Sequence, residues 1–354
     1  MNYTLAKLNG RRWLPLFLLL ITSLIGMVSV QQLAAKNIFS VDADPWIDTS
    51  DRQTVNDYYY TNFLPSQGIP MNWTGDYAAC TPGTTSQAYR DGVLMQINYF
   101  RAMAGVPAAV TFSDTFNGKA QQAALMMSVN GTLSHSPPPS WTCYTADGAE
   151  AAGKSNLGMS YGGMPYEIAY YIDESLPSVG HRRWILYPQT MQMGTGDISE
   201  SYPPYPMTNA LWVMDDHIWD TRPSTRENFV AWPPPGYLPH PMVPDLWSIS
   251  PTRTDFTVAT VSMTMNGSPV NITDQYLFGC ASQFCAPEPV IVWVPDVAWS
   301  SLDLSSDIVF HVDVTAQFPS GSPEIFNYDV ILFAPSDTPP VNFTNWVYLP
   351  SILK

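Results

Sequence analysis

The sequence has 354 residues, which is more than one average domain, so we expect two domains. Charged residues make up 13% of the chain and aromatic residues another 13%, which is typical of a globular protein and not of an acidic disordered tail. The net charge of −15 argues against a nucleic-acid partner, because the phosphates would be repelled.

The N-terminus has the pattern of a secretory leader. Lys7, Arg11 and Arg12 precede an uncharged apolar run over residues 14–30, and the small residues Ala34 and Ala35 follow it. We therefore predict a signal peptide over residues 1–35. The run is also long enough for an uncleaved anchor, since a membrane span needs about 20 residues, and membrane association is expected only in that case.

The four cysteines also suit an exported protein. They fall two and two into the halves of the chain, so the pairs Cys80–Cys143 and Cys280–Cys285 are favoured among the three connectivities. Neither pair has the Cys-x-x-Cys spacing of a zinc ribbon. Sequons compatible with glycosylation, if the source is eukaryotic, begin at Asn72, Asn130, Asn266, Asn271 and Asn342.

Two helices are predicted in the first third of the chain. Residues 36–79 show no sustained period, and we interpret them as an irregular arm. Residues 87–104 place apolar side chains at intervals of three and four, as an amphipathic helix does. Ser113 or Asp114 can cap a second helix that runs to Asn130.

The middle of the chain is less regular. A short helix is predicted over residues 166–174, and strands around residues 194–196 and 211–214. Prolines then become dense, and we interpret residues 233–251 as a stiff linker between two domains.

The last hundred residues change to a period of two. Apolar and polar residues alternate over residues 260–265, 308–315 and 326–333, and Asn266-Gly267 marks a turn. Several strands at such intervals predict an antiparallel β-sandwich, immunoglobulin-like, over residues 252–354.

A set of motifs occurs in a characteristic order between the two regions. A helix with Asn and Arg three apart is followed by a helix that ends before a His, then by a small box, an acidic helix and a Gly-His box: Asn98 and Arg101, His135, Ser155-Asn156-Leu157, Tyr171-Ile172-Asp173-Glu174, and Gly180-His181-Arg182. This order, over about residues 86–196, resembles the CAP superfamily of cysteine-rich secretory, venom-antigen and pathogenesis-related proteins, also called SCP domains.

The resemblance implies a fold and a site. It implies an α-β-α sandwich, assigned here to residues 80–232, so that the whole chain is of the α+β class. It also implies a shared cleft lined by His135, Ser155, Asn156, Glu174 and His181. Such a cleft binds a lipid or sterol, a protein partner or a divalent metal, and catalysis is not established across the family.

The metal hypothesis depends on three of these residues. His135, His181 and Glu174 can hold zinc with water completing the shell, or position a water for general base chemistry. One departure weakens the metal hypothesis, because Ser155 stands where the family has Glu and one anionic ligand is lost. The acids that can substitute for it are Glu150, Glu167 and Asp173.

The sequence thus predicts a secreted, monomeric binding protein that is not an enzyme. A metal-dependent extracellular hydrolase and a structural cell-surface protein remain as alternatives. Arg182 and Arg183 can bind an anion at the cleft rim, but a pair of arginines on a solvated turn is the favoured interpretation.

Overall fold

The computed structural model describes residues 45–159, 166–200, 205–252, 256–279, 286–319 and 321–336. Residues 43–354 belong to one compact unit. The predicted signal peptide and the Cys280–Cys285 pair lie outside the described residues. Within the described segments, no helix is long and apolar enough to cross a membrane.

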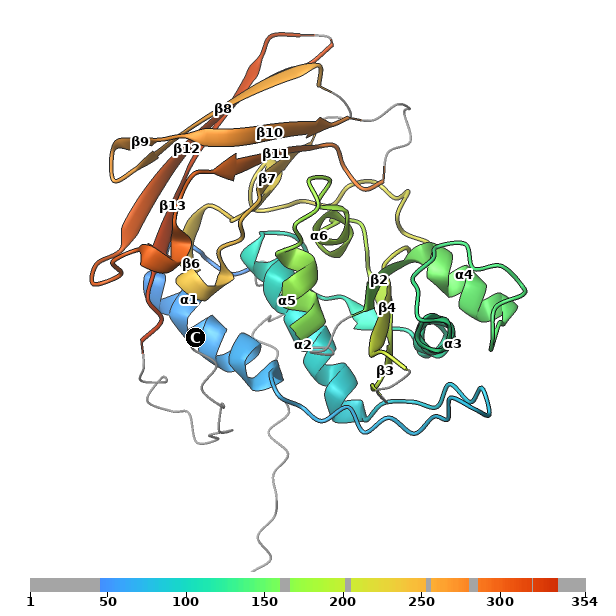
Figure 1. Cartoon of the computed structure of the whole chain (residues 1–354). Helices are drawn as coiled ribbons and strands as arrows, with labels where there is room; N and C mark the ends of the chain where they lie inside the picture. Colours follow the sequence, from blue (N-terminus) through green and yellow to red (C-terminus); the bar gives the residue numbers. More distant parts are fainter. Residues whose placement is uncertain are drawn as a thin grey trace, which may run out of the picture. The chain divides into compact units, whose positions relative to one another are not determined.

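The first region is built around a four-stranded sheet with the order β1-β3-β4-β2. Its strands are β1 Thr111–Phe112, β2 Ser155–Met159, β3 Gln192–Ile198 and β4 Thr208–Trp212, and only β1 and β3 are parallel. Helices lie on both faces, which gives the three α-β-α layers that the resemblance implied (Figure 1). On one face are α3 Asp114–Asn130 and α4 Ala146–Lys154; on the other are α2 Gln87–Met103, α5 Tyr166–Ile172 and α6 Gly180–Ile185.

The two long helices begin and end where their sequence signals predicted. The Ser86 side chain accepts a hydrogen bond from the Tyr89 N–H at the start of α2, and Ser113 accepts from the Phe116 N–H at the start of α3. α3 ends at Gly131, whose φ of 62° is left-handed and therefore favours glycine. Helix α4 and strand β2 were not predicted.

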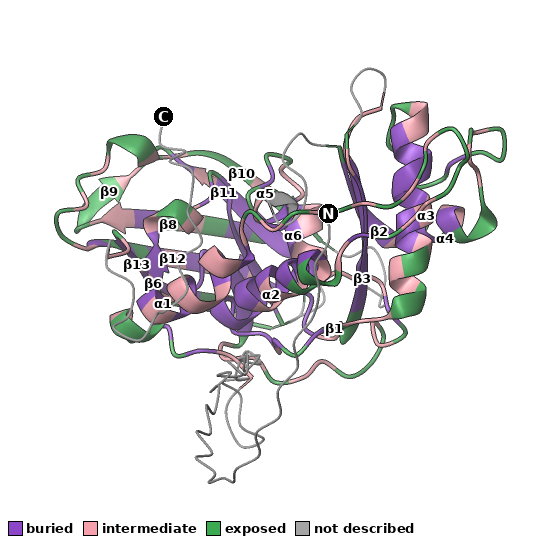
Figure 2. Ribbon diagram, turned by 90° about the horizontal axis from the view of Figure 1, so that it is seen from below, coloured by how far each residue is buried: buried purple, intermediate pink, exposed green. Residues whose placement is uncertain are grey.

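Small residues let α3 approach the sheet closely. Ala120, Ala123 and Ala124 on α3 are fully buried. Figure 2 shows buried positions along α3. Opposite them on β3, a Cβ added to Gly196 would overlap the backbone of Ala120. The close packing of helix and sheet therefore depends on the absence of a side chain at Gly196.

The segment predicted as an irregular arm contains a helical stretch over residues 52–66. It contains α1 Arg52–Tyr58, the π-helix η1 Tyr59–Phe63 and the 3₁₀ turn η2 Leu64–Ser66. Tyr58 stacks on Tyr99 of α2 with ring centroids 5.3 Å apart. The helical signal is Val55, Tyr59 and Phe63 at intervals of four, which is too short a run to stand out from its polar surroundings.

The second region consists of two sheets. One has the order β10-β11-β7-β5 and the other β6-β13-β12-β8-β9. The bounds are β5 Phe229–Trp232, β6 Gly236–Pro239, β7 Trp247–Pro251, β8 Val258–Met265, β9 Ser268–Val270, β10 Ile272–Phe278, β11 Val290–Pro295, β12 Ile308–Gln317 and β13 Glu324–Phe333, with 3₁₀ turns η3 His240–Met242 and η4 Trp299–Ser301. The predicted alternation in β8, β12 and β13 is confirmed.

The two sheets face each other through aromatic side chains. Trp247 of β7 and Phe310 of β12 have ring centroids 5.6 Å apart, as do Phe229 of β5 and Phe326 of β13. These contacts make the second region a β-sandwich. That it is specifically immunoglobulin-like stays a prediction.

The segment predicted as a linker is part of this sandwich. Residues 233–251 contain β6, which pairs in parallel with β13, and β7, which pairs with β5 and β11. Strand β5 already belongs to the sandwich, so the change of architecture comes at Phe229 and not after Pro251. The prolines misled the prediction because they stand at strand ends and on the edge strand β6, where no ladder N–H is needed.

The predicted disulfide between Cys80 and Cys143 is present, with Cα atoms 5.2 Å apart. It ties the segment before α2 to the loop after α3. Such a bond is consistent with an oxidising compartment.

We expect Gly196→Ala to lower the free energy of unfolding by about 1–3 kcal/mol, because the added methyl group must push α3 away from β3. Gly118→Ala is the matched control: it lies on α3, no atom is within 4 Å of its added Cβ, and helix propensity predicts a gain of about 0.5–1 kcal/mol. Urea denaturation measures both. Equal effects of the two variants would contradict the proposed close packing.

Removing the disulfide should cost about 4 kcal/mol in the chain-entropy model, because it closes a loop with a sequence separation of 63 residues. The comparison is thermal unfolding of wild type and of the Cys80→Ser/Cys143→Ser double variant, each with and without reductant. Reductant should lower the melting temperature of the wild type by more than that of the double variant, which keeps only the predicted Cys280–Cys285 pair. A wild type that is insensitive to reductant would show that this bond contributes little.

Candidate functional site

The Gly-His box forms the short helix α6, which carries His181, Arg182 and Arg183. It follows Val179, whose φ of 40° is left-handed, so the chain turns sharply into the helix. Six residues cannot sustain a helix alone. The position of His181 therefore depends on what holds α6 in place.

His181 is paired with a buried carboxylate. Glu174 is 4% exposed, and its Oε2 lies 3.2 Å from Nδ1 of His181, whose side chain is 24% exposed. The two atoms are close enough for an ion pair when the imidazole is protonated, but they are not aligned as a hydrogen bond. The other oxygen, Oε1, accepts the backbone N–H of Arg182 at 3.2 Å. Glu174 thus holds both the ring and the backbone of α6.

One further residue of the predicted cleft, Asn156, lies beside this pair, together with Tyr171 of α5. Asn156 of β2 is 2% exposed and donates from Nδ2 to the His181 carbonyl at 3.1 Å. The ring of Tyr171 lies against the imidazole with centroids 4.6 Å apart, and its hydroxyl donates to Asn209. The box and the acidic helix therefore meet α6 as the resemblance implied.

Ser155 contributes no charge to this site. The residue is 4% exposed, and its buried hydroxyl has no hydrogen-bond partner among the residues that the structure describes. A carboxylate at this position would add a negative charge next to Asn156. With serine, the start of β2 is neutral.

The ring of His135 is bonded to a different part of the domain. Its ring is exposed, and Nδ1 lies 2.8 Å from the Ala152 carbonyl near the end of α4. Because neutral carbonyl oxygens accept, this nitrogen is the donor in that contact. Among the contacts of the described residues, none joins the His135 ring to His181 or Glu174.

The predicted zinc ligands are not brought together. Over the described ranges, no three His, Cys, Asp or Glu side chains are arranged to hold a metal ion. Glu150 is bonded to Lys119 and Lys154, which lower its pKa to about 2. The side chain of Glu167 lies outside the described residues. The residues present therefore do not fit a zinc ion held by three protein ligands.

The two arginines of the box are not on a solvated turn. Arg182 is 1% exposed and donates to the carbonyls of Ile172 and Leu246 and to the hydroxyl of Ser248, at 2.6, 2.8 and 2.9 Å. Burial lowers the pKa of Arg182 to about 10, so it stays charged at neutral pH. The favoured sequence interpretation was wrong here. The sequence signal for this burial is the apolar run directly after the two arginines. A charged side chain next to a buried apolar run needs buried hydrogen-bond partners.

Arg183 makes the same kind of contact with the sandwich. It donates to the carbonyls of Pro287 and Glu288, at 3.2 and 2.6 Å. Both arginines thus join α6 to the second region.

A third arginine holds the other end of α6. Arg101 of α2 is fully buried and donates to the carbonyls of Ile185 and Tyr187, at 2.7 and 2.9 Å. Asn98, one turn earlier, bonds both backbone groups of Val110. The Asn and Arg of the first motif therefore organise the loops around the site.

Comparisons with known proteins agree with the motif order. Residues 94–215 match the family model CAP, described as the Cysteine-rich secretory protein family. No curated protein matches the sequence.

A solved structure, PcoC, a methionine rich copper resistance protein from Escherichia coli, shows 16% identity over 29% of this chain and 92% of that chain. Its TM-score of 0.20 is too low to establish a shared fold. The family match, the ordered motifs and the contacts of α6 together identify residues 94–215 as a CAP domain.

Proposed function

We propose that this protein is an extracellular CAP protein that binds an apolar small molecule, of lipid or sterol type, without chemical turnover. The observation that carries the proposal is a cavity of about 190 Å³ that is lined by residues of α2, α5 and the turn η3. It begins at Asp173, the residue before Glu174, so it adjoins the site without including the imidazoles.

The lining of this cavity suits an apolar molecule. Phe100 of α2, Ile172 of α5, and Met242 and Val243 beside the turn η3 all face it. Tyr170 at its edge is 59% exposed, so its ring is accessible to a ligand. Ligand pockets are commonly lined in this way, with a few polar groups that fix the orientation.

One carboxyl group supplies the polar contact. Asp173 lines the cavity, and burial raises the pKa of its carboxyl group. It accepts the backbone N–H of Asp245 at 3.3 Å through Oδ1. The hydroxyl of a sterol, as a donor, would complement its remaining oxygen.

Separate observations support the proposed extracellular location. CAP proteins are typically secreted, and the Cys80–Cys143 disulfide is consistent with an extracellular location. Asn72, Asn266 and Asn271 are exposed, so glycosylation at these sequons would be compatible with the fold.

Filling the cavity should abolish binding. We expect Ala169→Trp, on the cavity wall, to weaken binding of a fluorescent sterol and of a fluorescent fatty acid at least about 10-fold, because the indole occupies the space of the ligand. Ala149→Trp on α4 is the matched control, as it is partly exposed and distant from the cavity lining. Fluorescence titration measures both.

If the two variants bind the probes equally, the cavity is not the binding site. If the wild type binds neither probe, the apolar-ligand proposal fails, and a protein partner becomes the better explanation for the exposed Tyr170.

Zinc should not bind specifically at the imidazoles. We expect isothermal titration to show the same weak binding for wild type, His135→Ala and His181→Ala, because these rings do not converge with a third ligand. One-to-one binding that is lost in both variants would instead restore the metal site and the hydrolase alternative.

A further inference from the structure

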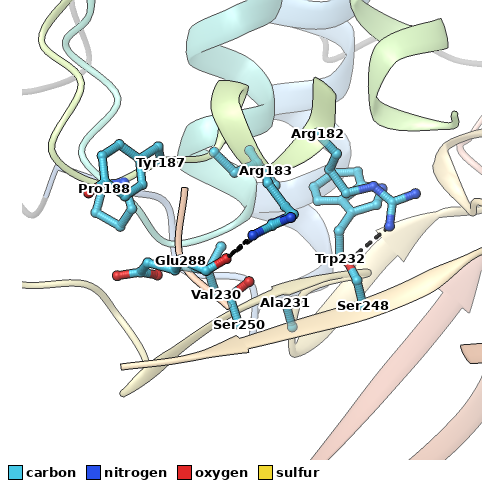
Figure 3. A pocket seen from close by; sticks show the side chains of 11 residues that line it. Arg182, Arg183, Tyr187, Pro188, Val230, Ala231, Trp232, Ser248, Ser250 and Glu288 are labelled. Atoms are coloured by element: carbon cyan, nitrogen blue, oxygen red, sulfur yellow. Dashed lines mark hydrogen bonds between the residues drawn. The ribbon is translucent and has the colours of Figure 1, made fainter. Parts of the chain in front are cut away.

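A second cavity lies between α6 and the sandwich (Figure 3). It is separate from the proposed ligand cavity and shares no lining residue with it. Its volume is about 20 Å³, which is room for one water molecule or one monatomic ion. Strands β5 and β7 form its floor, and the arginines of α6 form its opposite wall.

Arg182, one of the residues that line this cavity, has one unsatisfied nitrogen. Nε and Nη1 donate to Ile172, Leu246 and Ser248, but Nη2 is buried without a hydrogen-bond partner among the described residues. Arg182 lines the cavity. A buried charged donor without a partner costs more free energy than an ordinary missing hydrogen bond, so an occupant that accepts a hydrogen bond is expected.

A second unsatisfied donor belongs to the same cavity. Trp232 of β5 is fully buried and lines it, and its Nε1–H has no partner in the described part of the chain. Guanidinium and indole N–H groups can only donate. The hydroxyls of Ser248 and Ser250 lie on the same wall and can donate as well. The cavity is thus rich in donors.

The charges around the cavity favour an anion. Neither Arg182 nor Arg183 forms an ion pair within the described residues, since their guanidinium groups bond neutral oxygens. The Glu288 carboxylate also lines the cavity, but it is bonded to Arg222 at 2.5 Å. In Figure 3 it points away from the Arg182 guanidinium. Glu174 attracts both arginines, yet its oxygens are directed at His181 and the Arg182 backbone.

We propose that this cavity binds a single monatomic anion of chloride type, held by Nη2 of Arg182 and Nε1–H of Trp232. A phosphate or sulfate ion is too large for the space. The bound anion compensates the buried guanidinium charge and fixes α6 against β5 and β7. A water molecule would fill the same volume, and the experiment distinguishes the two.

Bromide replaces chloride and can be located by anomalous scattering. Crystals of the protein grown in sodium bromide should show an anomalous peak in the cavity within about 3.5 Å of Arg182 Nη2 and Trp232 Nε1. Density at that place without anomalous signal, as from water, would overturn the proposal. This measurement uses the wild type and does not depend on how any variant folds.

Melting temperatures in solution give an independent test. In sodium chloride the melting temperature of the wild type should rise saturably, relative to sodium gluconate of equal ionic strength, because the larger anion cannot enter. Trp232→Phe removes one donor and should weaken the apparent chloride affinity at least about 10-fold. Trp247→Phe is the matched control, since its indole N–H is also buried without a partner but does not line the cavity. The same chloride dependence in all three proteins would contradict the site.

Discussion

The position of the site depends on buried guanidinium groups that bond backbone carbonyls. Arg101 holds the C-terminal end of α6 through Ile185 and Tyr187, and Arg182 holds its start against α5 and β7. Both groups are almost completely buried, so their desolvation is costly and only several hydrogen bonds offset it. These hydrogen bonds fix the position of α6. With six residues, the helix could not be stable through its own hydrogen bonds alone.

The same contacts explain why the CAP domain and the sandwich are joined directly. Arg182 and Arg183 donate to residues of the sandwich, and Trp232 of β5 packs on Phe100 of α2 with centroids 5.2 Å apart. A flexible linker would leave these buried donors unsatisfied. The Gly-His box therefore serves two purposes, because it presents His181 on one side and anchors the second region on the other.

Sequence patterns predicted the elements that are long and periodic. The spacing and caps of α2 and α3, and the alternation in β12 and β13, were sufficient because burial repeats there with one period. The order of motifs also brought Glu174, Asn156 and His181 together. The motif order could not show that His135 lies apart from these residues. The ring of His135 is bonded to a backbone carbonyl, and because every residue has one, the sequence does not identify this partner. The burial of Arg182 was not predicted either, because its guanidinium also bonds backbone carbonyls, which the sequence does not identify as partners.

Arg182 also links the two proposed binding sites. Its Nε donates to the carbonyl of Ile172, and Ile172 and Asp173 line the larger cavity, while Arg182 itself lines the smaller one. An anion that orients this guanidinium therefore also orients the end of α5. If the two ligands affect each other's affinity, linkage requires the effect to be equal in both directions. Two contacts join the walls of the two cavities, the bond from Arg182 to the Ile172 carbonyl and the packing of Trp232 on Phe100, so the coupling should pass through Arg182 and Trp232.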